Sequence, residues 1–284
     1  MSLRERSGRY AARVARPDQL NVRDSGRPGA QPIVFVHGFG CDQHMWRHVT
    51  PAFEADHRVI TFDLVGAGGA DPAAWDPVRY DSLGAYADDI LAVIHGLDLR
   101  DVVLVGHSVS AMTGVLAAVA EPDLFSALVL IGPSPRYLDD GDYRGGFSEA
   151  DITDLLASLD SNYLGWSTAM APVIMGNGDR PALGEELTAS FCRMDPDVAR
   201  QFARVTFLTD CRASLPAVTT PTLVLQCQQD VIAPVQVGQY VADAIPGAEM
   251  VLLDATGHCP HLSAPGDTIA AIREFLPSAL PVAT

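Results

Sequence analysis

A serine stands where an apolar run gives way to a run of small residues. The stretch VVLVGHSVSAMTG, residues 102–114, reads as a buried strand ending near Gly106, a turn at Ser108, and a helix. This order is typical of the GxSxG turn, which exposes a nucleophilic serine, although Ser110 replaces the last glycine. Strand and helix nearly touch in such a turn, and Ser110 adds only a hydroxymethyl group. We therefore predict that Ser108 is a nucleophile, with a buried helix N-cap as the alternative.

An acid and a base follow two other predicted strands. Asp230 comes just beyond TLVLQC, and His258 comes beyond EMVLLD in the loop ATGHCPH. The order Ser, Asp, His is one of the chain orders of the acyl-transfer triad. His258 would take the proton from Ser108 and deliver it to the leaving group, while Asp230 would fix the imidazole tautomer. Asp139, after the strand ALVLIG, is the rival acid; the strand just before Asp230 and the helix-initiating APV after it favour Asp230.

The loop HGFGCDQ, residues 37–43, follows another apolar run and supplies backbone donors. The N–H groups of Phe39 and Val109 can form an oxyanion hole, in which losing one donor typically costs about 2 to 4 kcal/mol of transition-state stabilisation. The Phe39 ring would also make the approach to Ser108 apolar. His37 and His107 flank these turns, and we expect both to be structural, with their imidazoles hydrogen-bonded to the backbone.

The chain that must position these residues alternates between two patterns. Short β-branched runs alternate with helical periodicity, which predicts an α/β fold with a mostly parallel sheet and helices on both faces. Predicted strands cover 32–37, 58–63, 102–106, 127–132, 222–227 and 249–254, and predicted helices cover 42–53, 82–96, 109–120, 234–245 and 267–275. Before them, VARPDQLNVRDSG could form a weaker antiparallel hairpin at the sheet edge.

The alternation stops between Pro133 and about Pro216, where several helix-like segments rich in bulky residues follow one another. An excursion of this length between two sheet strands is best interpreted as an inserted helical cap. Ligands bind at the carboxyl ends of strands in such sheets, so the cap would roof the site. We divide the chain into a core, residues 1–133 and 214–284, and a cap, residues 134–213.

Composition excludes several classes of function. The net charge of −16 makes nucleic acid and anionic membrane surfaces unlikely partners, and no apolar run is long enough to span a bilayer. The five cysteines are scattered without CxxC spacing, which fits free thiols, and we place the protein in the cytoplasm.

Two groups of histidines could suggest a metal site, but neither has the required spacing. His44 and His48 lack the glutamate of HExxH, and Cys259 and Pro260 beside His261 give no four-ligand set. We therefore expect no metal and no cofactor.

Together these residues resemble a known family. The stretches that carry the resemblance are HGFGCDQ (37–43), FDLVGAG (62–68), GHSVSAM (106–112), GPSPRYLDDGDYRGGF (132–147), FCRMDP (191–196), LQCQQDVIAP (225–234) and GHCPHLS (257–263). They look like the RsbQ family, which contains a bacterial stress-response regulator and the plant strigolactone and karrikin receptors. The resemblance runs from about Pro32 to the C-terminal helix and so covers most of the chain.

The resemblance implies an α/β-hydrolase fold with a four-helix, V-shaped cap over a deep apolar pocket. It implies slow hydrolysis of small hydrophobic ester, butenolide-type lactone or enol-ether ligands, with the triad on Ser108, Asp230 and His258 and the oxyanion donors on Phe39 and Val109. Its pocket wall would include Phe39, Tyr137, Trp166, Met170, Phe207 and Cys211.

Two classes of function remain open at this point. The first is a serine hydrolase that works through an acyl-enzyme. The second is a regulator that binds a hydrophobic metabolite and signals to a partner protein, with turnover incidental. Within enzymes, a carbon–carbon bond hydrolase or a perhydrolase could use the same triad. Haloalkane dehalogenases and epoxide hydrolases are disfavoured because they need a carboxylate nucleophile where Ser108 stands.

Overall fold

A seven-stranded sheet forms the centre of the molecule. The computed structural model describes residues 14–279. The strand order is β1-β3-β2-β4-β5-β6-β7, and every neighbouring pair is parallel except β1 with β3. The strands are β1 (Arg23–Gly26), β2 (Pro32–Val36), β3 (Arg58–Phe62), β4 (Val102–His107), β5 (Phe125–Ile131), β6 (Thr222–Gln229) and β7 (Glu249–Thr256). All six strands predicted from apolar runs are confirmed.

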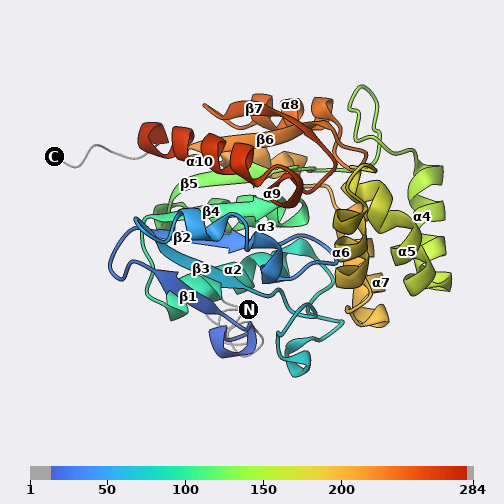
Figure 1. The fold of residues 1–284 in the computed structure, drawn as a ribbon, viewed down its shortest axis with the longest axis horizontal. Helices are drawn as coiled ribbons and strands as arrows, with labels where there is room; N and C mark the ends of the chain where they lie inside the picture. The colour runs from blue at the N-terminus through green and yellow to red at the C-terminus, as the bar shows by residue number, and fades with distance from the viewer. Residues whose placement is uncertain (1–13, 280–284) are drawn as a thin grey trace, which may run out of the picture.

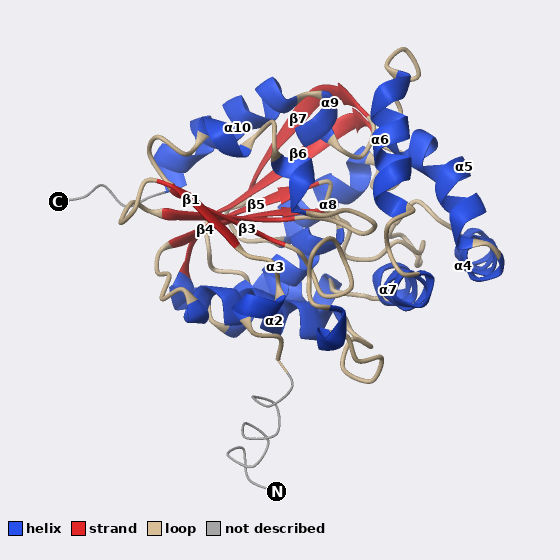
Figure 2. Ribbon diagram, turned by 60° about the horizontal axis from the view of Figure 1, so that its bottom comes forward, coloured by secondary structure: helices blue, strands red, loops and turns tan. Residues whose placement is uncertain are grey.

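Helices cover both faces of the sheet. In Figure 2, α2 (Leu83–Gly96) and α3 (Val109–Ala120) lie on one face, and α10 (Pro265–Ala279) lies on the other. The short α9 (Pro260–Ser263) precedes α10, and α8 (Val235–Ala244) packs against β6 and β7. Because both faces are covered, central strands such as β2 and β4 are buried along their whole length. The predicted α/β architecture is confirmed.

Two local predictions are wrong. The helix expected over 42–53 is replaced by two 3₁₀ turns, Gln43–Trp46 and Thr50–Ala52. Pro51 explains the break, because proline has no N–H to donate and disfavours helical backbone in the residue before it. The N-terminal hairpin is also absent from the described chain: residues Pro17–Gln19 form a 3₁₀ turn, and β1 alone pairs antiparallel with β3.

Four helices fill the long excursion between β5 and β6. They are α4 (Glu149–Ser161), α5 (Tyr163–Met175), α6 (Pro181–Phe191) and α7 (Pro196–Leu208), and we call them the cap helices. Local signals set their starts: Ser148 and Asp151 form a capping box before α4, and Asp195 caps α7, whose first residue is Pro196. The cap helices gather at one end of the sheet, at the right of Figure 1.

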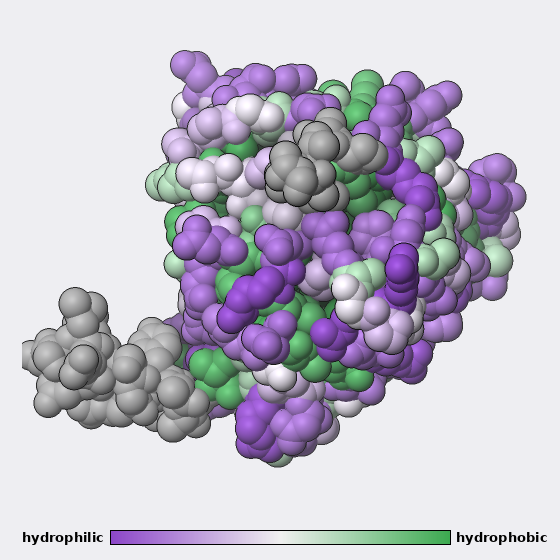
Figure 3. All heavy atoms as spheres, turned by 90° about the vertical axis from the view of Figure 1, so that its left-hand side faces the viewer, coloured by the Kyte–Doolittle hydropathy of each residue, from purple (hydrophilic) through white to green (hydrophobic). Residues whose placement is uncertain are grey.

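The opposite end of the sheet carries a mixed surface. Figure 3 shows hydrophilic and hydrophobic residues interspersed over that end, away from the cap helices. No helix within residues 14–279 combines the length and the apolar character needed to cross a membrane.

Candidate active site

The turn between β4 and α3 holds Ser108 in a strained backbone conformation. Its φ is 57° and its ψ is −122°, which is unusual for a residue with a side chain. The Ser108 N–H donates to the carbonyl of Ile131 at 2.8 Å and so ties the turn to β5. A Cβ on Gly106 would lie 2.4 Å from the carbonyl oxygen of Ser110. Gly106 is therefore required for the close approach of strand and helix, whereas the side chain of Ser110 is tolerated.

Ser108, His258 and Asp230 form one hydrogen-bonded chain. His258 Nε2 lies 2.8 Å from Ser108 Oγ, and His258 Nδ1 lies 2.7 Å from Asp230 Oδ2. The other oxygen of Asp230 accepts the N–H groups of Ile232 and Ala233 at 2.8 and 3.0 Å. All three members of the chain are buried. The arrangement can carry a proton from the serine hydroxyl to the imidazole while the carboxylate holds the ring.

The surroundings of Asp230 keep it ionised. Burial alone would raise the pKa of its carboxyl, but the charge of His258 and the hydrogen bonds from His258, Ala233 and Ile232 hold that pKa below the ordinary value. The rival acid Asp139 is elsewhere: it accepts the N–H of Gly146 and pairs with Arg144. His258 thus pairs with the aspartate that the sequence favoured.

The loop after β2 passes directly over Ser108. A Cβ on Gly38 would lie 2.7 Å from His107 Nδ1 and 3.1 Å from Ser108 Cβ, so only glycine fits there. The N–H of Phe39 takes part in no hydrogen bond within the described chain. Val109 is the first residue of α3, so its N–H has no acceptor within the helix. Both predicted oxyanion donors are therefore free to bind a ligand oxygen.

Two histidines near the site form hydrogen bonds with backbone groups. His37 Nε2 accepts the N–H of Leu64 at 3.0 Å, and its Nδ1 lies 2.9 Å from the carbonyl of Gly38. His107 Nε2 lies 2.8 Å from the carbonyl of His258, and burial lowers the pKa of His107 to about 3. Their contacts match the structural role expected from the sequence.

A cluster missed by the sequence analysis lies behind His258. His107, Cys259 and His261 are buried, and each has a potential metal-binding atom within 4.8 Å of the others. His107 comes from a distant strand, so spacing along the chain could not place it beside His261. Its Nε2 bonds the carbonyl of His258, whereas its Nδ1 and both ring nitrogens of His261 have no hydrogen-bond partner among the described residues.

The cavity above Ser108 is small and apolar. It holds about 30 Å³, room for only about one or two water molecules. Phe39, Tyr137, Trp166 and Phe207 line it, as the resemblance implied. Phe191, Leu187, Ile174 and Ile232 also line it, and the sequence analysis did not name them.

Two residues expected in the pocket wall do not reach this cavity. Met170 is half-buried on α5, and Cys211 is buried after α7, but neither lines the space above Ser108. The cavity is small, and the residues named above already form its wall. Burial raises the pKa of the Cys211 thiol to about 11, so the thiol stays protonated at neutral pH.

Aromatic rings close the cavity. The Phe39 ring centre lies 6.3 Å from that of Trp166 and 5.8 Å from that of Phe191, both nearly edge to face. The Trp166 and Phe191 rings are stacked with their centres 5.9 Å apart. Burial raises the pKa of the Tyr137 phenol, an effect that the Ser108 hydroxyl partly offsets. The cavity is thus much smaller than the deep apolar pocket that the resemblance implied, because rings from the cap helices fill much of that space.

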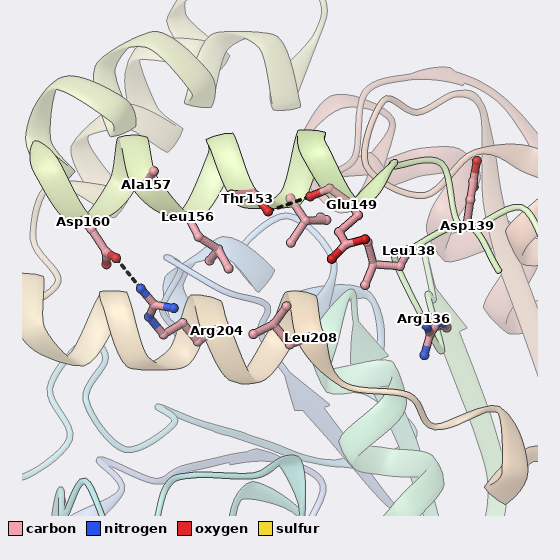
Figure 4. Close-up of a pocket in the computed structure, with 11 residues that line it drawn as sticks. Arg136, Leu138, Asp139, Glu149, Thr153, Leu156, Ala157, Asp160, Arg204 and Leu208 are labelled. Carbon is pink, nitrogen blue, oxygen red and sulfur yellow. Dashed lines mark hydrogen bonds and ion pairs between the residues drawn. The ribbon is translucent and has the colours of Figure 1, made fainter.

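A larger hollow lies outside the site. It holds about 620 Å³ and runs between α4 and α7 on the outer surface. Figure 4 shows Leu156 and Leu208 facing one another across it, with Arg204 paired to Asp160 at one end. Its lining residues do not include Ser108 or His258, so this hollow is separate from the candidate active site.

Residues 33–272 match the model of the Alpha/beta hydrolase family. The chain belongs to this family. It is 40% identical over 265 residues to a protein of Arabidopsis thaliana named Strigolactone esterase D14, covering 93% of this chain and 97% of that protein. It is 39% identical over 258 residues to Karrikin insensitive 2 receptor CA of Petunia hybrida, covering 90% and 95% of the two chains. These relatives place it in the plant-receptor branch of the α/β hydrolases.

A solved structure agrees with the α/β-hydrolase fold. A hydrolase from Oleispira antarctica superimposes with a TM-score of 0.89 at 37% identity, covering 92% of this chain and 97% of that one. Family, relatives and fold together identify this α/β hydrolase as an enzyme.

Proposed function

We propose that this α/β hydrolase cleaves small hydrophobic esters, butenolide-type lactones or enol ethers through an acyl-enzyme on Ser108. The observation that carries the proposal is the hydrogen-bonded chain from Ser108 through His258 to Asp230, which opens onto an apolar cavity. His258 removes the proton from Ser108 as the hydroxyl attacks the carbonyl carbon, and returns it to the leaving group. Water then attacks the acyl-enzyme with His258 again as the base.

The oxyanion of the tetrahedral intermediate binds to the N–H groups of Phe39 and Val109 in this proposal. The geometry supports it, because the Phe39 N–H is unused and the Val109 N–H begins a helix whose dipole favours negative charge. The apolar cavity excludes water and so strengthens both hydrogen bonds.

Substrate entry requires the cap helices to move. A cavity of about 30 Å³ is too small for a butenolide, because drug-sized ligands occupy pockets of about 300 to 1,000 Å³. We propose that residues 134–213 act as the cap over a core of residues 1–133 and 214–284. Opening would have to separate the packed rings of Phe39, Trp166 and Phe191, and we propose that this step limits the rate of turnover.

A signalling role is the second candidate. Its support is the similarity to relatives named karrikin insensitive 2 receptors, at 39% identity for the example above. In that role the bound hydrophobic ligand would change the position of the cap helices for a partner protein. The cytoplasm remains the compartment that we propose for either role.

Hydrolysis of a p-nitrophenyl ester and of a fluorogenic butenolide by the wild type and by Ser108→Ala tests the enzyme. We expect Ser108→Ala to lose about 10⁴-fold or more in kcat, and the wild type to carry an acyl adduct on Ser108 by intact-mass measurement. Ser126→Ala is the matched control, because Ser126 bonds Asp101 at the other end of the sheet. A wild type that turns over neither probe, yet gains thermal stability from the butenolide, would favour the receptor instead.

A further inference from the structure

The loop of residues 37–43 is held by two serine hydroxyls from opposite sides. From the core, Ser110 Oγ donates to the carbonyl of His37 at 2.5 Å. From the cap, Ser190 Oγ donates to the carbonyl of Gly40 at 2.9 Å. The Phe39 N–H lies in the chain between these two carbonyls. The loop that carries this donor is therefore held by α3 two residues before Phe39 and by α6 just after Phe39.

The end of α6 makes further contacts with the same region. Phe191 packs so closely on Gly40 that a Cβ there would lie 2.4 Å from its ring carbons. Gly40 has a φ of +71°, so the turn and the ring contact both require glycine. Arg193 pairs with Asp42 at 2.8 Å, just beyond the helix. The carbonyl of Gly40 is thus one of several points at which α6 rests on the loop.

The same helix closes the cavity. Leu187 and Phe191 of α6 line the space above Ser108, which cannot admit a substrate without moving cap helices. A shift of α6 that widens the cavity also pulls the Ser190 hydroxyl from the carbonyl of Gly40. Hydrogen bonds lengthened beyond about 3.5 Å lose most of their strength, so the loop loses its outer anchor when α6 moves.

We propose that Ser190 is a positioning residue that aims the Phe39 N–H at the oxyanion only while α6 rests on the loop. The catalytic power of the hydrolase then depends on the closed cap, and a substrate too large to let α6 return reacts slowly although it binds. The proposal rests on the oxyanion role proposed for Phe39. Ser110, at the position of the last motif glycine, is the corresponding inner anchor.

Kinetics of Ser190→Ala with a p-nitrophenyl ester test the proposal. We expect kcat to fall about tenfold with KM nearly unchanged, because the donor is displaced but not removed. Affinity for a trifluoromethyl ketone, which forms a tetrahedral adduct with Ser108, falls by a similar factor, while affinity for the corresponding methyl carbinol, which forms no adduct, is retained. Ser190→Thr keeps the hydroxyl and restores both.

Thr188→Ala is the matched control. Its hydroxyl bonds Gly184 within α6 and does not touch the loop, so loss of helix stability alone would affect both variants. If Ser190→Ala and Thr188→Ala have the same kcat and the same ketone affinity, Ser190 has no positioning role.

Hydrogen exchange keeps the proposal testable if the proposed function itself fails. We expect amides of residues 37–43 to exchange faster in Ser190→Ala than in the wild type, and unchanged in Thr188→Ala. A wild type without esterase activity would overturn the proposed function, while faster exchange confined to Ser190→Ala would still show that α6 anchors the loop. Equal exchange in all three proteins would overturn the proposal that Ser190 anchors the loop.

Discussion

The core and the cap contribute to the candidate site in different ways. The core fixes Ser108, Asp230 and His258 by strand ends and backbone hydrogen bonds, such as those that Asp230 accepts from Ile232 and Ala233. The cap contributes mostly apolar rings, such as Trp166 and Phe191, whose contacts are not directional. Hydrogen-bonded geometry sets what the site can do, whereas ring packing sets how much room it has.

The two regions are nevertheless joined at the loop that carries His258. The His258 N–H donates to the carbonyl of Ile174 on α5 at 2.9 Å, and Asn177 Nδ2 donates to the carbonyl of Thr256 at 2.7 Å. Thus α5 supports the proposed base, just as α6 supports the oxyanion loop. The comparison can be tested by variants that act on the core, on this junction, or on the cap alone.

The largest effect should come from the core. We expect Asp230→Asn to lower kcat about 10⁴-fold with the fold intact, because an amide selects the wrong imidazole tautomer. Steady-state ester hydrolysis measures it. Asp139→Asn is the control, since Asp139 pairs with Arg144 on the surface. Equal losses in the two variants would mean that the acid is misassigned.

A substitution where the His258 loop contacts the end of α5 should give the largest loss of stability. A Cβ on Gly257 would lie 1.8 Å from the carbonyl oxygen of Met175, and Gly257 has a φ of +89°. We expect Gly257→Ala to lower the free energy of unfolding by about 2 kcal/mol or more, from strain plus overpacking. Urea denaturation measures it. Gly247→Ala has the same kind of positive φ, +73°, with no atom nearby, and so isolates the clash.

A change in the cap should alter selectivity more than rate. Trp166→Leu removes a ring from the cavity wall, and we expect the ratio of kcat/KM for p-nitrophenyl butyrate over acetate to rise about tenfold. Leu164→Ala, on the exposed side of α5, should leave the ratio unchanged. If Trp166→Leu lowered kcat for both esters equally, ring packing would be part of the chemistry, and the distinction drawn above would fail.

The smallest effect concerns the contact between α7 and the core. Tyr80 donates a hydrogen bond to Asp89 at 2.8 Å, and Gln201 of α7 donates to the carbonyl of Tyr80. Burial raises the pKa of Asp89 to about 6 from an ordinary 3.8. The folded state therefore holds this proton longer than the unfolded state, so its stability falls as pH rises from about 4 to about 6.

Thermal unfolding across this pH range measures the effect. We expect the stability of the wild type relative to Asp89→Asn to decline between about pH 4 and pH 6 and to level off above. A constant difference across that window would mean that Asp89 is ionised in the folded state throughout.

The sequence predicted those features that depend on residues close together in the chain. Central strands such as β2, β4 and β5 were predicted because burial on both faces leaves a continuous apolar signature, whereas β7, which is largely exposed, was predicted from its apolar run alone. The structure brings Ser108, His258 and Asp230 together, as their positions after three strands suggested, and their roles stay predictions. Pro51 was the local signal that should have ended the helix expected over 42–53.

The rest depended on contacts between distant segments. Nothing in the spacing of Phe191 indicates that its ring lies on Gly40, because α6 and the loop are far apart in the sequence, as the separation of 150 residues between Ser190 and Gly40 shows. The same applies to the closed cavity, whose volume is set by how several rings pack against one another. An apolar pattern shows that such residues are buried but does not show what they touch.

The contacts of the His258 loop with the end of α5 constrain how this architecture could be recombined. A chimera that received residues 134–213 from a relative would replace Met175 and Asn177 but keep Gly257 and Thr256. The donor helix corresponding to α5 would have to end in a turn that leaves its last carbonyl beside Gly257 of the recipient. The cap is thus not an exchangeable module by itself; the smallest transferable unit includes the seven residues of GHCPHLS.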